Sequence, residues 1–175
     1  KNIEILICLN GNTVKFNNIL KKKFRKFKKI KFYEIKTKNI VDALNFLITK
    51  CKGKYIARMD ADDISSPDRF KEQINFLEKN KEYFVSTNAE VINENLDKIY
   101  NHKYTNQKKF FTNPIIHPSI MIKSEILKKT IYRNIPFAED YDLYLRLEKK
   151  GIRLNNLNKN LIFYKLNEKN IRNYK

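Results

Sequence analysis

The chain has 175 residues, of which 42% are hydrophobic and 13% aromatic, so it can build one folded core but is too short for two ordinary domains. Its formal net charge of +18 excludes an acidic protein. No apolar run reaches the roughly 18 to 20 residues that a membrane-spanning helix needs, and no signal-peptide pattern is present. These features predict a single cytoplasmic domain.

The positive charge leaves two interpretations open. Lysine clusters attract polyanions such as nucleic acids and anionic membranes. However, Lys, Asn and Ile are abundant along the whole chain, which is typical of an AT-rich genome whatever the function. The densest basic run, residues 21–29, has Leu20, Phe24 and Phe27 at helical spacing and therefore predicts an amphipathic helix with a cationic outer face. Such a helix would either rest on anionic lipid or be solvated.

Both cysteines, Cys8 and Cys51, fall in apolar periodic segments. Their spacing does not match a metal site. They are predicted to be buried, reduced thiols, as expected in a cytosolic protein.

Strands and helices alternate in the first half of the chain. Apolar runs predict strands over 3–9, 31–35 and 55–59, and helical spacing predicts the basic helix, a helix over 40–51 and a helix that begins at Ser66-Pro67. This order favours an α/β fold with a mostly parallel sheet flanked by helices. In such sheets ligands bind at the carboxyl ends of the strands.

The second half has shorter elements, which predict a smaller antiparallel portion. Strands are expected over 85–88, 98–104, 153–157 and 161–166, an extended segment over 114–122, and helices over 124–129 and 138–150. His117 precedes a proline, so its backbone should be extended. We interpret this histidine as a packed, hydrogen-bonded side chain rather than a catalytic one.

Three carboxylates, Asp60, Asp62 and Asp63, follow the predicted strand over 55–59. Carboxylates this close repel one another unless a cation, a basic side chain or backbone donors neutralise them. A divalent ion that holds a diphosphate is the sharpest explanation. The alternative is a capped turn before a helix, where aspartate is also common.

Two acidic motifs carry a family resemblance. Residues 53–70, GKYIARMDADDISSPDRF, resemble the metal-binding DXD region of family-two glycosyltransferases with the GT-A fold. Residues 138–147, AEDYDLYLRL, resemble the second acidic motif of that family, and HPSIM at 117–121 is similar to its connecting strand. The resemblance covers most of the chain, from about residue 3 to residue 166.

The resemblance implies a single GT-A (Rossmann-like) domain, with 1–83 as the nucleotide-sugar-binding half and 84–175 as the acceptor-binding half. It implies transfer of a hexosyl group, with inversion, from a nucleoside-diphosphate donor to a glycan or lipid-linked acceptor in surface polysaccharide synthesis. The implied cofactor is Mg²⁺ or Mn²⁺, with Asp62 as the direct ligand, Asp60 near the ribose or a metal-bound water, and Asp63 in support. Asp140 would be the catalytic base and Glu139 its neighbour on the acceptor side. The alternative for both is capping of a helix.

Further residues are candidates with two interpretations each. Asp42 and Asn45 would approach the donor nucleotide or form the polar face of a helix. Arg58 and Arg69 would contact the diphosphate or, as we favour, balance the carboxylates. Asn10 stands where the family has aspartates, and it can hydrogen-bond a base without supplying charge.

The chain also departs from the family pattern. Nothing upstream of Ile3 supplies the family's first strand, which predicts a chain truncated at its N-terminus and leaves the activity of this polypeptide alone open. Lys165-Leu166-Asn167 stands where relatives often have Arg and then His, so a third metal ligand is not assigned. Rival hypotheses are another divalent-metal phosphate enzyme, a basic module for nucleic acid or anionic membrane, and an inactive fragment. We expect no nucleic-acid partner, and peripheral contact with the inner face of the membrane.

Overall fold

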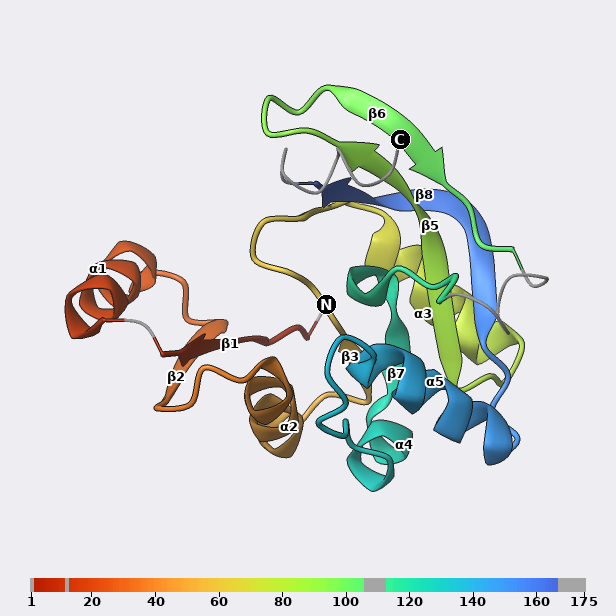
Figure 1. Cartoon of the computed structure of the whole chain (residues 1–175), viewed down its shortest axis with the longest axis horizontal. Coiled ribbons are helices and arrows are strands. Elements are labelled where there is room, and N and C mark those ends of the chain that lie inside the picture. Colours follow the sequence, from red (N-terminus) through yellow and green to blue (C-terminus); the bar gives the residue numbers. More distant parts are fainter. Residues whose placement is uncertain (1, 12, 106–112, 167–175) are drawn as a thin grey trace. The chain divides into compact units, whose positions relative to one another are not determined.

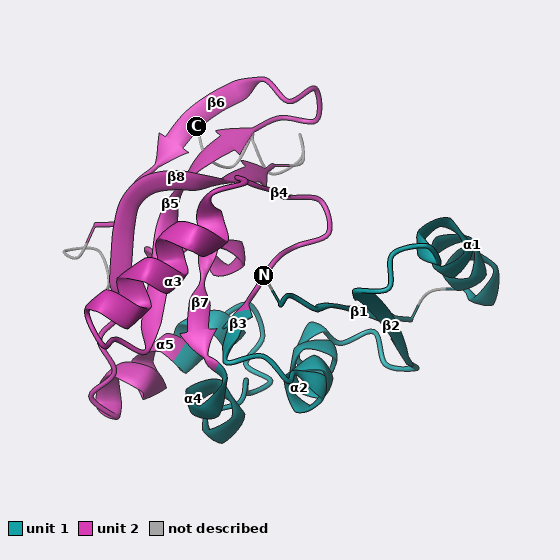
Figure 2. Ribbon diagram, turned by 180° about the vertical axis from the view of Figure 1, so that it is seen from behind, with its two compact units in different colours: residues 1–56, 124–143 teal, residues 57–123, 144–175 magenta. Residues whose placement is uncertain are grey.

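The computed structural model describes residues 2–11, 13–105 and 113–166 (Figure 1). They form two compact units, the first made of 1–56 and 124–143 and the second of 57–123 and 144–175 (Figure 2). This division does not coincide with the 83/84 boundary suggested by the sequence, and the assignment of a nucleotide half and an acceptor half stays a prediction.

Unit 1 contains a two-stranded parallel sheet. Strand β1 (Ile5–Asn10) pairs in register with β2 (Ile30–Ile35), so that Asn10 lies opposite Ile35. Gly11 then turns the chain with a φ of 70°, and a Cβ there would lie 2.3 Å from the Cγ of Lys38. The two predicted strands of this region are thus confirmed as a parallel pair, and β1 ends in a turn that favours glycine.

The basic helix is shorter than the sequence suggests. Helix α1 is Val14–Phe24, and Thr13 caps it by accepting a hydrogen bond from the Phe16 amide at 3.3 Å. The prediction that the whole basic run is helical is wrong, because the chain turns at Phe27 to begin β2. The Phe27 amide donates to the Phe24 carbonyl at 3.0 Å, and the Ile30 amide donates to the Phe27 carbonyl at 2.9 Å.

Helices α2 (Ile40–Lys50) and α4 (Ser124–Lys129) complete the regular elements that lie wholly in unit 1. The Asn39 side chain caps α2 by accepting hydrogen bonds from the amides of Val41 and Asp42, at 2.7 and 3.4 Å. The buried stripe of α2 consists of Val41, Ala43 and Ile48, and the helix packs on β1. Both helices match the ranges predicted from the sequence.

Cys8 and Cys51 also lie in this unit. They are free thiols and only partly buried, which corrects the prediction that they are core residues. Burial still raises the pKa of each thiol above its ordinary value, and for Cys51 the charge of Glu4 raises it further.

The chain passes from unit 1 into unit 2 within β3 (Tyr55–Ala57). The larger sheet has the order β3-β7-β5-β8-β4, with β6 paired to β5. The bounds of the remaining strands are Ile64–Ser65 for β4, Phe84–Ile92 for β5, Lys98–His102 for β6, Met121–Lys123 for β7 and Asn155–Lys165 for β8. The central strand β5 is parallel to β8 and antiparallel to β6 and β7. The sheet is therefore mixed, and the α/β class with an antiparallel portion is confirmed.

Some strand predictions need correction. The two strands expected over 153–157 and 161–166 are one strand, β8, because its pairing with β5 continues past residues 158–160 through two register shifts. The segment over 114–122 is not extended throughout, since His117–Ser119 form a turn of 3₁₀ helix before β7. Strand β4 has only two residues and carries no alternation that a sequence pattern could reveal.

Helix α3 (Arg69–Lys79) packs on β5, and α5 (Glu139–Lys149) begins in unit 1 and ends in unit 2. Helix α3 begins three residues after Ser66, where the sequence predicted its start. The Arg69 amide donates to the Ser66 carbonyl at 3.1 Å, and this i to i−3 hydrogen bond forms a turn before the helix. The core of unit 2 is formed by fully buried apolar side chains, among them Leu77, Phe84, Ile122, Leu147 and Ile162. Among the described residues, no helix combines the length and the apolar character that crossing a membrane requires.

His117 is partly buried, and its ring meets the Tyr144 ring edge to face, with centroids 6.5 Å apart. Burial, and to a smaller extent the charge of Arg58, holds the pKa of His117 well below its ordinary value of 6.5. This geometry agrees with the packed histidine that the sequence suggested.

We expect His117 to make the protein less stable as the pH falls. The imidazole stays neutral in the folded chain but takes up a proton in the unfolded chain below its ordinary pKa of 6.5, so unfolding gains a proton. Between about pH 7.5 and about pH 5.5, wild type should lose about 1.4 kcal/mol more unfolding free energy than His117→Gln. Urea unfolding at both pH values measures the difference. Equal losses in the two proteins would contradict the assignment.

Candidate functional site

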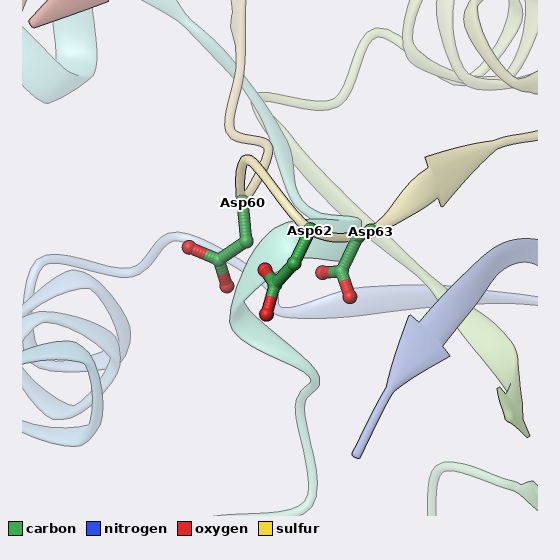
Figure 3. A group of neighbouring side chains, drawn as sticks. All are labelled: Asp60, Asp62 and Asp63. Atoms are coloured by element: carbon green, nitrogen blue, oxygen red, sulfur yellow. The ribbon is translucent and has the colours of Figure 1, made fainter. Parts of the chain in front are cut away.

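The three aspartates of the acidic motif lie on the loop between β3 and β4. One carboxylate oxygen from each of Asp60, Asp62 and Asp63 lies within 4.8 Å of the others, and the side chains project from the same side of the loop (Figure 3). Asp62 is exposed, Asp60 is partly buried and Asp63 is buried. The structure thus brings together all three predicted metal ligands.

Asp63 has the most constrained carboxylate of the three. Its Oδ1 accepts a hydrogen bond from the backbone amide of Lys165 at 2.8 Å, while its Oδ2 is buried and has no hydrogen-bond partner among the residues that the structure describes. Burial raises the pKa of Asp63 to about 6, and the charges of Asp60 and Asp62 add to this effect, against the Lys165 amide and the charge of Arg58. A cation beside Oδ2 would remove this penalty, so the residues present fit a divalent metal ion.

The support from Lys165 was not visible in the sequence. The family resemblance points to the side chains at 165–167 as the place of a third metal ligand. The contact to Asp63 comes instead from the main chain at the end of β8. A backbone donor leaves no signature in residue type, so no sequence pattern could have identified it.

Arg58 neutralises part of the acidic loop. Its guanidinium Nη1 is paired with Asp60 Oδ2, and its side chain is largely buried. This ion pair agrees with the balancing role that the sequence favoured. It leaves Asp62 as the exposed member of the aspartate group.

Arg69 is wholly buried, with no exposed surface, and it holds the backbone on which the aspartates sit. Its Nη2 donates to the carbonyls of Arg58 and Ile120, at 2.9 and 3.1 Å. Its Nη1 lies 3.3 Å from the sulfur of Met59. Burial, and to a smaller extent the charge of Arg58, lowers the pKa of Arg69 to about 10, against the opposing effect of Asp63. Arg69 therefore supports the main chain of the loop and, being wholly buried, is not placed to contact a diphosphate.

Gln73 extends this buried polar contact by one turn of α3. Its Oε1 accepts from Arg69 Nε at 3.0 Å, and its Nε2 donates to the carbonyls of Ser119 and Val85, at 2.8 and 3.3 Å. Sequence reasoning missed Gln73. The available signal was its i, i+4 spacing from Arg69 in a helix whose other inner positions are apolar.

The other predicted site residues lie in unit 1. Asn10 ends β1, Asp42 lies exposed in the first turn of α2, and Glu139 and Asp140 begin α5. Asp140 Oδ1 accepts from the Tyr141 amide at 2.7 Å. The functional roles of all four stay predictions.

Asn45, the remaining candidate, holds the segment that follows α4. Its Nδ2 donates to the Tyr132 carbonyl at 2.9 Å, and its Oδ1 accepts from the Tyr132 amide at 3.0 Å. Both ends of the amide therefore serve the fold of unit 1. A contact of Asn45 with nucleotide stays a prediction.

Comparison with known proteins identifies the family. The model of Glycosyl transferase family 2 matches residues 1–139. The chain belongs to this family. Its relative WbnJ, an O-antigen biosynthesis glycosyltransferase of Escherichia coli, is 36% identical over 173 residues, an alignment that covers 94% of this chain and 68% of WbnJ.

Solved structures show the same fold. This family-2 chain matches S. aureus TarS in complex with UDP-GlcNAc with a TM-score of 0.73 at 14% identity, covering 94% of this chain and 50% of TarS 1-349. It matches the mannosyltransferase PcManGT from Pyrobaculum calidifontis, solved with GDP-Man and Mn²⁺, with a TM-score of 0.66 at 13% identity, covering 94% of this chain and 47% of that one. The chain thus spans about half of each solved relative, and the predicted GT-A fold is confirmed.

Replacement of Arg69 by methionine should destabilise the protein by roughly 3 to 5 kcal/mol, because three buried acceptors lose their cationic donor. The matched control is Lys71→Met, an exposed position on the same helix, which should change stability by no more than about 0.5 kcal/mol. Urea unfolding of both variants measures the effect. Similar small changes in the two would show that the Arg69 contacts do not hold the loop.

Proposed function

We propose that this chain is the catalytic domain of an inverting glycosyltransferase that uses a nucleoside-diphosphate sugar. The observation that carries the proposal is the group of three carboxylates, within 4.8 Å of one another, in a chain of glycosyl transferase family 2. The solved relatives with UDP-GlcNAc and with GDP-Man support a nucleotide-sugar donor. The O-antigen role of WbnJ supports a glycan or lipid-linked acceptor in surface polysaccharide synthesis.

Asp62, Asp60 and Asp63 would hold Mg²⁺ or Mn²⁺. When bound, the ion would stabilise the charge that develops on the leaving diphosphate. Asp62 is the exposed member and would make the direct bond. Asp60 stays oriented by its ion pair with Arg58, and Asp63 is fixed by the Lys165 amide. The Mn²⁺ in the PcManGT structure supports a divalent ion.

Asp140 would accept the proton of the attacking acceptor hydroxyl, since inversion in one displacement needs a single base on the acceptor side. Glu139 would orient the acceptor or the base. In this proposal Asn10, Asp42 and Asn45 contact the nucleotide. The Asn45 amide already binds Tyr132 at both ends, so a nucleotide would have to use its remaining N–H or its remaining oxygen lone pair.

Membership of the family argues against the rival of a phosphatase or nucleotidyltransferase with the same carboxylates. The alternative hypothesis of an inactive fragment predicts that the chain binds neither metal nor nucleotide, whereas the proposed function predicts that it binds both. Measurements of nucleotide binding and turnover on this chain therefore distinguish the two hypotheses.

Asp62→Ala should weaken metal-dependent nucleotide binding. Wild type should bind UDP or GDP in the presence of Mn²⁺ in calorimetry, and Asp62→Ala should weaken that binding at least about tenfold, since one lost charged ligand costs about 1.4 kcal/mol or more. The control is Asp68→Ala, an exposed aspartate that makes no side-chain cap bond to α3. Tight binding that survives Asp62→Ala would overturn the metal assignment.

Asp140→Asn should lower turnover by roughly 10²- to 10⁴-fold while nucleotide affinity stays near that of wild type, because it removes a base and no donor contact. Asp142→Asn, two residues further along α5 and 4.0 Å from Arg133 in its ion pair, is the control and should keep most activity. Release of the nucleoside diphosphate in the presence of donor and acceptor measures the turnover. Equal activity of Asp140→Asn and wild type would exclude Asp140 as the base.

A further inference from the structure

Helix α1 places its residues in an unusual way. The buried residue of this helix is the polar Asn17, whereas Val14, Phe16 and Ile19 are 72%, 47% and 55% exposed. Its inward contacts come from Leu20 and Phe24, which are partly buried. A helix that is merely solvated on its outer side would carry polar side chains there. Large apolar groups on that side therefore require another explanation.

The inward side of α1 is already occupied. The Phe24 ring lies 6.3 Å from the Phe32 ring on β2 and 6.1 Å from the Phe27 ring, centroid to centroid. Lys21 on the same helix pairs with Glu34 of β2. These contacts turn the side of α1 that carries Phe24 toward β2, and Ile19, five residues before Phe24, lies on the opposite side of the helix.

Lysines surround the outward apolar pair. Residues three or four apart lie side by side on a helix, so Lys15, Lys22 and Lys23 all neighbour Ile19. All three lysines are exposed. We call Lys15, Phe16, Ile19, Lys22 and Lys23 the α1 face. The segment around it, residues 13–31, holds nine Lys or Arg and no Asp or Glu.

We propose that the α1 face docks on an anionic lipid surface. The combination of apolar side chains in the middle and lysines around them matches the two parts of such a surface. Phe16 and Ile19 would enter the boundary between headgroups and acyl chains, and the lysines would meet the anionic headgroups. The long lysine stems allow the charges to reach the headgroups while the helix lies in the interface.

Other occupants fit this face less well. A nucleic acid would bind the lysines but would leave Ile19 in water, because aliphatic side chains gain nothing from phosphates. A second copy of the chain would bring two clusters of lysines against each other. The proposal goes beyond sugar transfer and does not depend on it, since it concerns residues that take no part in the acidic loop.

Sedimentation of the full chain with lipid vesicles tests the proposal. Vesicles of phosphatidylglycerol mixed with phosphatidylcholine should bind the protein, vesicles of phosphatidylcholine alone should not, and binding should weaken as salt is added. In the double variant Lys22→Gln, Lys23→Gln the affinity should fall roughly fivefold for each lysine removed. In Phe16→Ser, Ile19→Ser it should fall roughly tenfold or more at constant net charge.

The control variant removes the same number of positive charges from a different helix. Lys71→Gln, Lys79→Gln removes two exposed lysines from α3, in unit 2, and should leave vesicle affinity within about twofold. If this control loses as much affinity as the Lys22, Lys23 variant, net charge alone drives binding and the proposal is overturned. It is also overturned if the Phe16, Ile19 variant binds vesicles as wild type does, or if duplex DNA competes fully with the vesicles.

Circular dichroism should show that the variants keep their fold, because every substituted side chain is exposed. If the double apolar variant fails to fold, the single variant Ile19→Asn makes the same test, with a smaller expected loss. Calorimetry with Mn²⁺ and nucleotide on the same variants separates the two proposals. Loss of vesicle binding with nucleotide binding retained supports the α1 face, and a failure of nucleotide binding in wild type leaves the vesicle result unaffected.

Discussion

The buried guanidinium of Arg69 is the contact on which the acidic site of unit 2 depends. It joins α3 to two backbone carbonyls, one directly before the acidic loop and one directly before β7. A loop with three neighbouring carboxylates would tend to open, since the charges repel. Arg69 opposes this by holding the loop's main chain rather than its side chains. The carboxylates are therefore kept close, and their side chains project from one side of the loop (Figure 3).

The division of work between Arg58 and Arg69 follows from their burial. Arg58 reaches a carboxylate and offsets its charge. Arg69 has no exposed surface and binds neutral acceptors. The cost of burying that cation is reflected in its lowered pKa, and Gln73 and the carbonyls supply the hydrogen bonds that make the burial tolerable. Two arginines that look alike in the sequence thus have different functions.

Sequence patterns predicted the elements that have clear periodicity. The bounds of helices α2 and α4 and strand β2 differ from the predicted ranges by at most one residue. The same reasoning divided β8 in two, since residues 158–160 are polar although their strand continues. It also extended α1 too far, because the basic run keeps helical spacing after the chain has turned at Phe27. The length of β8 depends on its pairing with β5, and the end of α1 depends on the turn that leads into β2. Neither contact can be predicted from local periodicity.

The sequence predicted the candidate site only in part. Asp60, Asp62 and Asp63 were identified from residue type and position, because carboxylates at a strand end carry a chemical signature. Burial of Arg69 and the role of Gln73 were not identified, since a sequence does not show which polar residues lie inside.

The bond from the Lys165 amide to Asp63 has a consequence for how this family can diverge. A main-chain donor is present whatever side chain stands at that position, so the residue is free to drift between lineages while the carboxylate keeps its partner. Proline is the exception, because it has no amide hydrogen. The hydrogen bond to Asp63 therefore tolerates any residue except proline at position 165, a constraint that a search for an invariant side chain would overlook.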